Sequence, residues 1–147
     1  MHTLNVSLVD ISAQQLIDCG HQKDGCATGT PFSAMLEDLN LESEQDYPYE
    51  GVKRECRSDP RKKVANLPDF MTWSNVDAVS LMHGLYKYGP IAVLVDASSN
   101  SFKNYKSGVY YNSNCLETKE KLKHAMLLVG YGVDPKEGKF WILVSDH

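Results

Sequence analysis

Apolar residues recur at helical spacing along the first part of the chain and again shortly before residue 90. This spacing predicts helices over residues 12–19, 30–40 and 75–88. The first begins with Ser-Ala-Gln-Gln, a capping box in which Ser12 and Gln15 would each satisfy a backbone N–H at the helix start. The third ends at a Gly-Pro pair, since proline cannot continue a helix, and Ser74 or Asn75 would cap its start.

Beyond residue 90 the helical period gives way to short apolar runs. These runs predict strands over residues 91–95, 125–131 and 140–144, with a weaker strand over residues 108–111. The segment 133–139 carries a proline and a glycine and predicts a hairpin loop between the last two strands. Because helices precede strands along the chain, the order of the elements favours an α+β fold.

Polar, charged, glycine and proline residues dominate the stretch from residue 41 to residue 67. Such a composition is typical of a long surface connection rather than of a core. Within it, residues 53–63 hold six basic side chains with Glu55 and Asp59 between them. This mixture of charges indicates a solvated loop.

Charge and hydropathy exclude two classes of partner. The 147 residues include 15 Lys and Arg against 19 Asp and Glu, which gives a net charge of −4. Nucleic acid is therefore not expected as a partner, because phosphate binding requires an excess of positive charge. No apolar run is long enough to predict a membrane span, and the first residues lack the basic and apolar pattern of a secretory signal.

Four cysteines raise the question of disulfides or a metal site. In an oxidising compartment they could form two disulfides, and a bond between Cys19 and Cys26 is one such pairing. A metal site built from Cys19, His21, Cys26 and Cys56 is the alternative. Because no two cysteines have the Cys-x-x-Cys spacing of a zinc knuckle, neither a metal nor another cofactor is expected.

A single histidine opens the apolar run at residues 123–132, Lys-His-Ala-Met-Leu-Leu-Val-Gly-Tyr-Gly. An ionisable ring at the mouth of a buried strand is more often a hydrogen-bonded structural residue than a functional one. Its chemistry alone therefore leaves the role of His124 open.

Four stretches of the sequence resemble motifs of the papain-like cysteine peptidases, the family of papain and the lysosomal cathepsins. They are Ile-Ser-Ala-Gln-Gln-Leu-Ile-Asp-Cys at residues 11–19, Gly-Cys-Ala-Thr-Gly at 25–29, Asp-Tyr-Pro-Tyr at 46–49 and the run at 123–132. They occur in the family's order. The resemblance implies an incomplete papain-like α+β fold. Residues 1–70 would form part of the helical domain with its long connection, and residues 71–147 the β-rich domain.

By this resemblance, His124 is the family's catalytic histidine, which pairs with a cysteine thiolate and later protonates the leaving amine. The family's nucleophilic cysteine and oxyanion-hole glutamine lie upstream of the Ser-x-x-Gln helix, in a region that this sequence does not contain. Ser145 stands where the family keeps the asparagine that orients the imidazole. The implied activity is peptide-bond hydrolysis, and the chain as written is expected to be inactive. The alternative is a non-catalytic homologue that binds a peptide or a protein partner.

The same resemblance implies which residues would contact a substrate. Gly29 matches the glycine whose bare backbone hydrogen-bonds to an extended peptide. Pro31, Leu94 and Ala125 match positions that line the main specificity pocket, although ordinary core packing explains Leu94 and Ala125 at least as well. The expected partner is a peptide or protein substrate.

The resemblance also implies a disulfide between Cys19 and Cys56. The family partners of Cys26 and Cys115 are absent from the sequence, which predicts two free thiols. A lysosomal or extracellular location is implied as well. Without the family's central helix, apolar surface would be uncovered, so association through that surface is a further expectation.

Overall fold

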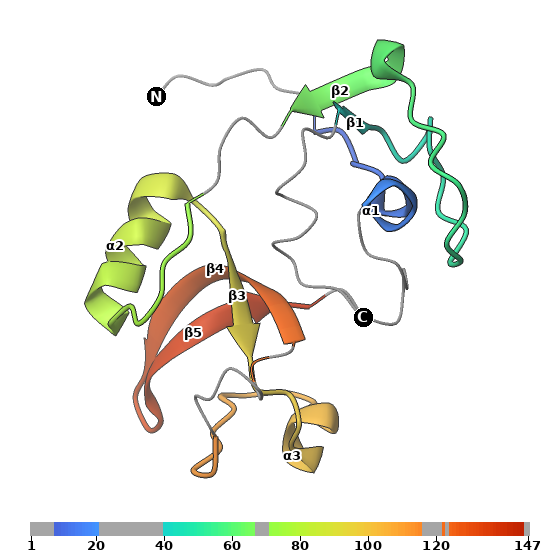
Figure 1. Ribbon diagram of the computed structural model, residues 1–147. Helices are drawn as coiled ribbons and strands as arrows, with labels where there is room; N and C mark the ends of the chain where they lie inside the picture. Colours follow the sequence, from blue (N-terminus) through green and yellow to red (C-terminus); the bar gives the residue numbers. More distant parts are fainter. Residues whose placement is uncertain (1–7, 21–39, 67–70, 116–121, 123, 146–147) are drawn as a thin grey trace. The chain divides into compact units, whose positions relative to one another are not determined.

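The computed structural model describes residues 8–20, 40–66, 71–115, 122 and 124–145. The chain divides into two compact units, Met1–Thr72 and Trp73–His147, and each is considered by itself. Helices and antiparallel sheets occur together, which confirms the expected α+β class (Figure 1). None of the helices in the described ranges has the length and apolar character needed to cross a membrane.

In the first unit, helix α1 covers Ala13–Cys19, as its spacing predicts. The Ser12 hydroxyl accepts a hydrogen bond from the backbone N–H of Gln15 at 3.0 Å. The second half of the predicted capping box is wrong, because the N–H of Ser12 donates to the carbonyl of Glu42 at 3.0 Å. The Gln15 amide oxygen instead accepts from the N–H of Glu42 at 2.8 Å. The start of the helix is therefore bonded to a neighbouring strand.

A short antiparallel pair, β1 (Asn40–Glu42) and β2 (Lys63–Asn66), lies within the stretch predicted as a surface connection. That prediction is wrong in part, because Leu41 and Tyr47 are buried. Strands of three and four residues are too short to display a period in the sequence. Most of the helix predicted over residues 30–40 lies outside the described residues, and its last residue begins β1 instead.

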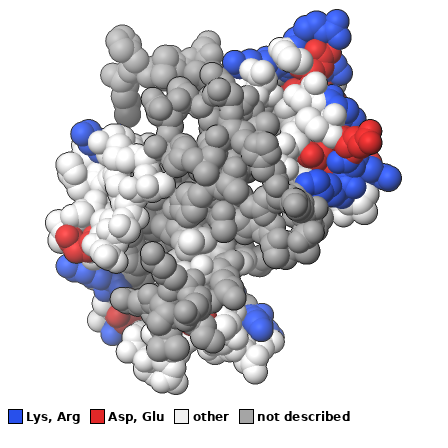
Figure 2. Space-filling model, in the orientation of Figure 1, with Lys and Arg blue, Asp and Glu red and all other residues white. Residues whose placement is uncertain are grey.

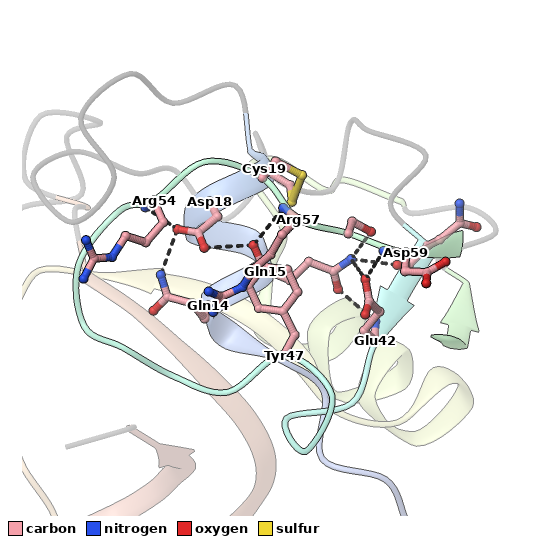
Figure 3. The surroundings of a disulfide bond; sticks show 12 residues. Gln14, Gln15, Asp18, Cys19, Glu42, Tyr47, Arg54, Arg57 and Asp59 are labelled. Carbon is pink, nitrogen blue, oxygen red and sulfur yellow. Dashed lines mark hydrogen bonds between the residues drawn. A yellow bond between two sulfur atoms is a disulfide. The ribbon is translucent and has the colours of Figure 1, made fainter. Parts of the chain in front are cut away.

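Asp18 lies near the end of α1 and is buried, with 5 % of its surface exposed. Its carboxylate accepts hydrogen bonds from the Tyr47 hydroxyl at 2.8 Å, the Arg54 backbone N–H at 2.7 Å and the Gln14 amide at 2.8 Å (Figure 3). Burial raises the pKa of Asp18, but these hydrogen bonds and the charge of Arg57 outweigh it, so the pKa lies below its ordinary value. The carboxylate is therefore held in its ionised form.

Gln14 bonds the same helix to the loop that follows β1. Its amide oxygen accepts from the backbone N–H groups of Glu50 at 2.9 Å and Gly51 at 3.1 Å. Its amide nitrogen donates to the carbonyl of Val52 at 2.7 Å. Gln14 and Gln15 are fully buried, and every buried side-chain nitrogen and oxygen of the described residues has a hydrogen-bond partner. The inner side of α1 thus holds this loop through polar contacts rather than apolar packing.

Replacing Tyr47 by Phe should lower the free energy of unfolding by about 1–2 kcal/mol. The Tyr47 hydroxyl donates to the buried carboxylate of Asp18 and accepts from the N–H of Arg57 at 3.3 Å, so its loss leaves both groups short of a partner. The matched control is Tyr49→Phe, because Tyr49 is 59 % exposed and should change stability by less than about 0.5 kcal/mol. Urea unfolding measures both variants, and equal losses would contradict a bridging role for Tyr47.

A disulfide joins Cys19, at the end of α1, to Cys56, which lies 37 residues further along the chain. It is the pair that the family resemblance implies, and the alternative bond between Cys19 and Cys26 is therefore wrong. Cys115 is free and exposed, as expected. Cys26 lies outside the described residues. The disulfide adds a covalent bond to the hydrogen bonds that hold the loop on α1.

The charged segment 53–63 lies mostly at the surface of the first unit, as predicted. Its single-turn helix η1 (Pro60–Lys62) is capped by Asp59, whose carboxylate accepts from the N–H of Arg61 at 3.0 Å. Ion pairs on this surface include Arg54 and Arg57 with Glu50, Arg61 with Asp59, and Lys62 with Asp46. Figure 2 shows basic and acidic atoms side by side here. Exposed pairs of this kind contribute little to stability.

In the second unit, helix α2 covers Ala78–Tyr88, within the predicted segment. Its N-cap is Asp77, whose carboxylate accepts a backbone N–H of the first turn at 2.9 Å. The predicted caps, Ser74 or Asn75, are therefore wrong. Asn75 has a φ of 55°, a left-handed conformation that lies outside a right-handed helix. Gly89 ends the helix with a φ of 88°, a conformation that glycine adopts without steric cost.

An antiparallel sheet in the order β3-β4-β5 forms the centre of the described part of the second unit (Figure 1). Its strands are β3 (Ile91–Val95), β4 (His124–Asp134) and β5 (Gly138–Val144). The predicted strands and the hairpin between the last two are confirmed, although β4 and β5 extend beyond the apolar runs. Helix α2 contacts β4, and Leu85 of the helix and Leu128 of the strand are both buried.

The weaker strand predicted over residues 108–111 is wrong. Gly108 has a φ of 90°, which breaks an extended chain, and the Tyr111 side chain is 80 % exposed. The segment before it forms a short helix, α3 (Asn100–Lys103), which the hydrophobic pattern does not predict. Four residues are too few to display a helical period.

Candidate active site

His124 is the first residue of β4, and its register partner is Val95 at the end of β3. Strand pairing therefore fixes its backbone. Side chains two residues apart share a face of a strand, so His124, Met126 and Leu128 form one row. Met126 is half-buried and Leu128 is fully buried, which makes this the inward-facing row. The half-buried imidazole thus opens the inner side of the strand, which accounts for a ring at the mouth of an apolar run.

Ser145 follows β5 directly, and because β5 runs antiparallel to β4, its end lies beside the start of β4. The Ser145 Oγ lies 3.4 Å from the Nε2 of His124. Hydroxyl hydrogen bonds are usually about 2.5–3.0 Å long. A serine hydroxyl reaches less far than the amide of an asparagine, so the contact is present but long.

Phe102 of α3 makes a second contact with the imidazole. The two ring centroids are 6.2 Å apart and the ring planes stand at 73° to each other, an edge-to-face arrangement. Sequence reasoning missed this residue. Ser99, which caps α3 by accepting from the N–H groups of Ser101 and Phe102, is a signal for a helix start, but no repeating pattern follows it.

The predicted pocket residues are only partly described. Leu94 and Ala125 are register partners in β3 and β4, one residue away from the pair of Val95 and His124. Leu94 is half-buried and Ala125 is exposed. Because successive side chains alternate between the faces of a strand, this pair lies on the opposite face from His124. The other two predicted substrate contacts, Gly29 and Pro31, lie outside the described residues.

None of the described cysteines has the surroundings of an activated nucleophile. Cys19 and Cys56 are bonded to each other. Cys115 is exposed and follows a turn, where its N–H donates to the carbonyl of Asn112 at 3.2 Å. It does not lie at a helix N-terminus, where the helix dipole stabilises a thiolate. The disulfide also removes two ligands of the alternative metal site, and no group of three His, Cys, Asp or Glu in the described ranges is placed to hold a metal.

Comparison with known proteins identifies the family. The model of the papain family cysteine proteases matches residues 1–145 of the chain. Cathepsin 7 of Rattus norvegicus is 38 % identical over 148 aligned positions, which cover 95 % of this chain and 44 % of that protein. Cathepsin M of Mus musculus is 39 % identical over 145 positions, which cover 92 % of this chain and 42 % of that protein. The chain belongs to the papain family of cysteine proteases.

Solved structures of the same family share the fold. The digestive procathepsin L2 proteinase from the larval midgut of Tenebrio molitor matches with a TM-score of 0.83 and 34 % identity, over 93 % of this chain and 43 % of that one. The procathepsin L 3 from the same source matches with a TM-score of 0.81 and 34 % identity, over 93 % and 45 % of the two chains. The chain thus has the papain-like α+β fold, and it spans less than half the length of these relatives.

Proposed function

We propose that His124 is the acid–base residue of a papain-type cysteine peptidase. In the first step a cysteine thiolate attacks the carbonyl carbon of the scissile peptide bond, and the resulting tetrahedral oxyanion collapses as the imidazolium gives its proton to the leaving amine. The products of that step are an acyl-enzyme, a free amine and a neutral imidazole, which can then activate water. The observation that carries the proposal is the imidazole at the start of β4 with Ser145 at its Nε2, in a chain of the papain family.

We infer a role for each ring nitrogen of His124 from the position of Ser145. When the imidazole is protonated, Nε2–H can donate to the Ser145 hydroxyl, whose oxygen lies 3.4 Å away. The proposal therefore gives the contact with the reacting sulfur to Nδ1. The hydrogen bond made by one ring nitrogen determines whether the other carries a proton in the neutral ring. Ser145 is therefore proposed to influence the tautomer of His124.

The proposal places the nucleophile outside residues 1–147. Cys19 and Cys56 form a disulfide, Cys115 is exposed after a turn, and Cys26 is matched by family resemblance to a disulfide cysteine. The rat relative has more than half of its length beyond the matched region, because the chain covers 44 % of it. A polypeptide of these 147 residues alone is therefore proposed to be inactive.

The chain of 147 residues should not hydrolyse a fluorogenic peptide in an inhibitor-sensitive manner. The measurement compares product release with and without an irreversible thiol inhibitor, and the control for contaminating protease is the His124→Ala chain prepared in parallel. Turnover that the inhibitor abolishes and that disappears in the His124→Ala chain would overturn the proposal that the nucleophile lies elsewhere.

Leu94 and Ala125 lie one position along the strands from Val95 and His124, on the other face, and are proposed to contact the substrate beside the imidazole together with Gly29 and Pro31. The described pair is apolar, and its members are adjacent across β3 and β4. An apolar wall suits a hydrophobic side chain of an extended peptide, while main-chain hydrogen bonds to Gly29 would hold its backbone. The substrate class proposed is therefore a peptide or protein with an apolar residue near the scissile bond.

A second candidate is a non-catalytic papain homologue that binds a peptide or a protein partner without cutting it. The long contact between Ser145 and His124 favours it, because a hydroxyl at 3.4 Å is a weaker partner for Nε2 than one at normal hydrogen-bond length. A chimera separates the two candidates. In this cathepsin chimera, residues 1–145 replace the matched region of the Tenebrio procathepsin L2. Peptide binding without turnover by the chimera would support the second candidate, and turnover would support the first.

A lysosomal or extracellular location is proposed for the protein. Disulfides persist in oxidising compartments, and Cys19 is bonded to Cys56. Two carboxylates of the first unit also have a pKa below the ordinary value. Hydrogen bonds from Arg61 lower the pKa of Asp59 to about 2, and the pKa of Asp18 is lowered as well. Both groups would therefore stay ionised in a mildly acidic compartment.

Stability of the first unit should be retained at mildly acidic pH. Because the folded-state pKa of Asp18 is lowered from 3.8, its contribution is present above that value and is lost as the pH falls through the folded-state pKa. Urea unfolding should give similar midpoints from about pH 7 to about pH 5 and a lower midpoint below about pH 3. The decline should be shallower in Asp18→Asn. An equally steep decline in that variant would contradict the role of Asp18.

A further inference from the structure

Aromatic rings of the second unit connect His124 to two tyrosines. Phe102 contacts the imidazole with ring centroids 6.2 Å apart. Tyr110 packs against Phe102 in an edge-to-face arrangement, with centroids 5.4 Å apart and planes at 86°. Tyr105 contacts Tyr110 at 6.2 Å and 84°. Phe102 is therefore held between the imidazole and Tyr110.

Hydroxyl groups fix the outer end of Tyr110. Its OH lies 2.8 Å from the Ser101 Oγ and 3.1 Å from the Ser99 Oγ, both within hydrogen-bond distance. Ser99 also caps α3, since its Oγ accepts from the N–H groups of Ser101 at 3.1 Å and Phe102 at 3.3 Å. The same short helix thus carries both the ring that contacts His124 and the hydroxyls that hold Tyr110.

The imidazole needs such support because its own torsion does not fix it. The χ2 angle of histidine has a broad preference, so the ring plane is set by the groups around it. Ser145 supplies a contact of 3.4 Å at Nε2, which is long for a hydroxyl. The edge of Phe102 also contacts the ring. Its position depends in turn on Tyr110.

We propose that Tyr110, held by Ser99 and Ser101, is a positioning residue that sets the orientation of the His124 ring through Phe102. The importance of this orientation for peptide hydrolysis rests on the proposed function. The orientation itself is a property of the second unit and can be measured without turnover. A general base must point one nitrogen at the reacting atom, and a tilt of its ring reduces the rate.

The test is nuclear magnetic resonance of the chain with ¹⁵N-labelled histidine. The His124 signals are assigned as those lost in His124→Gln. In the parent chain at a pH where the ring is neutral, the two ring nitrogens of His124 should give well-separated signals, because one tautomer dominates. In Tyr110→Phe the two signals should move toward each other, and the ring protons should shift as Phe102 moves. The matched control is Tyr111→Phe, since Tyr111 is 80 % exposed and adjacent in sequence.

A second variant keeps the test decisive if Tyr110→Phe does not fold. Ser101→Ala removes a hydroxyl partner of Tyr110 on an exposed residue, and it should shift the His124 signals in the same direction. Unchanged His124 signals in the folded variants would overturn the proposal. Shifts of equal size in Tyr111→Phe would overturn it as well, because they would not depend on Tyr110.

A change at Ser145 distinguishes a positioning role of Tyr110 from a merely structural one. Ser145→Asn supplies a longer, more directional partner for Nε2. Tyr110→Phe should therefore shift the His124 signals less in the Ser145→Asn background than in the parent, and a shift of the same size would count against the proposal. These outcomes do not depend on turnover. If the cathepsin chimera proves inactive while the signals move as expected, the proposed function fails and the positioning role stands.

Discussion

Removing the disulfide with the double substitution Cys19→Ala and Cys56→Ala should lower the free energy of unfolding by about 3–4 kcal/mol. The bond closes a loop between residues 37 positions apart, and its loss releases that loop in the unfolded chain. The loss is a large fraction of the stability of an ordinary domain, about 5–15 kcal/mol. Urea unfolding of the oxidised parent and the double variant measures it.

The matched control for this change is Cys115→Ala. Cys115 is free and exposed, so its replacement should alter the free energy of unfolding by less than about 0.5 kcal/mol. A reducing agent should destabilise the parent chain and leave the double variant unaffected. A loss below about 1 kcal/mol in the double variant would mean that the disulfide adds little to the hydrogen bonds of Asp18 and Gln14.

In the cathepsin chimera, His124→Ala should lower kcat by about 10²–10⁴-fold with a smaller effect on KM. The imidazole is proposed to take part in both proton transfers of the reaction, whereas the contacts that bind the peptide come from other residues. Loss of a group that acts in the transition state appears in kcat and in kcat/KM alike. Steady-state kinetics with a fluorogenic peptide gives both constants.

His83→Ala is the control for this variant. His83 lies on α2 in the same unit and is exposed, so its removal should leave kcat within about twofold of the parent chimera, as for an exposed surface substitution. If His83→Ala and His124→Ala reduce kcat equally, the loss reflects damage to the second unit rather than to the chemistry. Full activity in His124→Ala would contradict the assignment of the base.

The sequence predicts the longer elements of the fold well. The apolar residues of helix α2 recur at a helical period, and strand β4 contains a continuous apolar run; both signals are visible in the sequence. The pair of β1 and β2 could not be predicted in the same way. Glu42 is buried in β1 with 1 % of its surface exposed, and hydrogen bonds rather than hydrophobicity hold it there. The pattern of hydrophobic residues cannot predict the burial of a charged side chain that hydrogen bonds hold in place.

Some residues of the candidate site could be predicted from the sequence, and others could not. His124 could be predicted because a motif surrounds it in the sequence, and Ser145 because it follows a recognisable strand. Phe102 could not, since it meets the imidazole only through the fold, 22 positions away in the chain and on a helix of four residues. Side-chain contacts of this kind depend on tertiary packing, and the hydrophobic period of a local stretch of sequence carries no information about such packing.

The most direct test of the central claim is the pH dependence of alkylation of the nucleophilic cysteine in the cathepsin chimera. If His124 faces a sulfur anion, a thiolate persists well below the ordinary thiol pKa of about 8.5, and iodoacetamide should react rapidly even in mild acid. In His124→Ala the alkylation rate in mild acid should fall, and it should rise only as the pH approaches the pKa of an ordinary thiol. The same pH profile with and without the imidazole would contradict the claim.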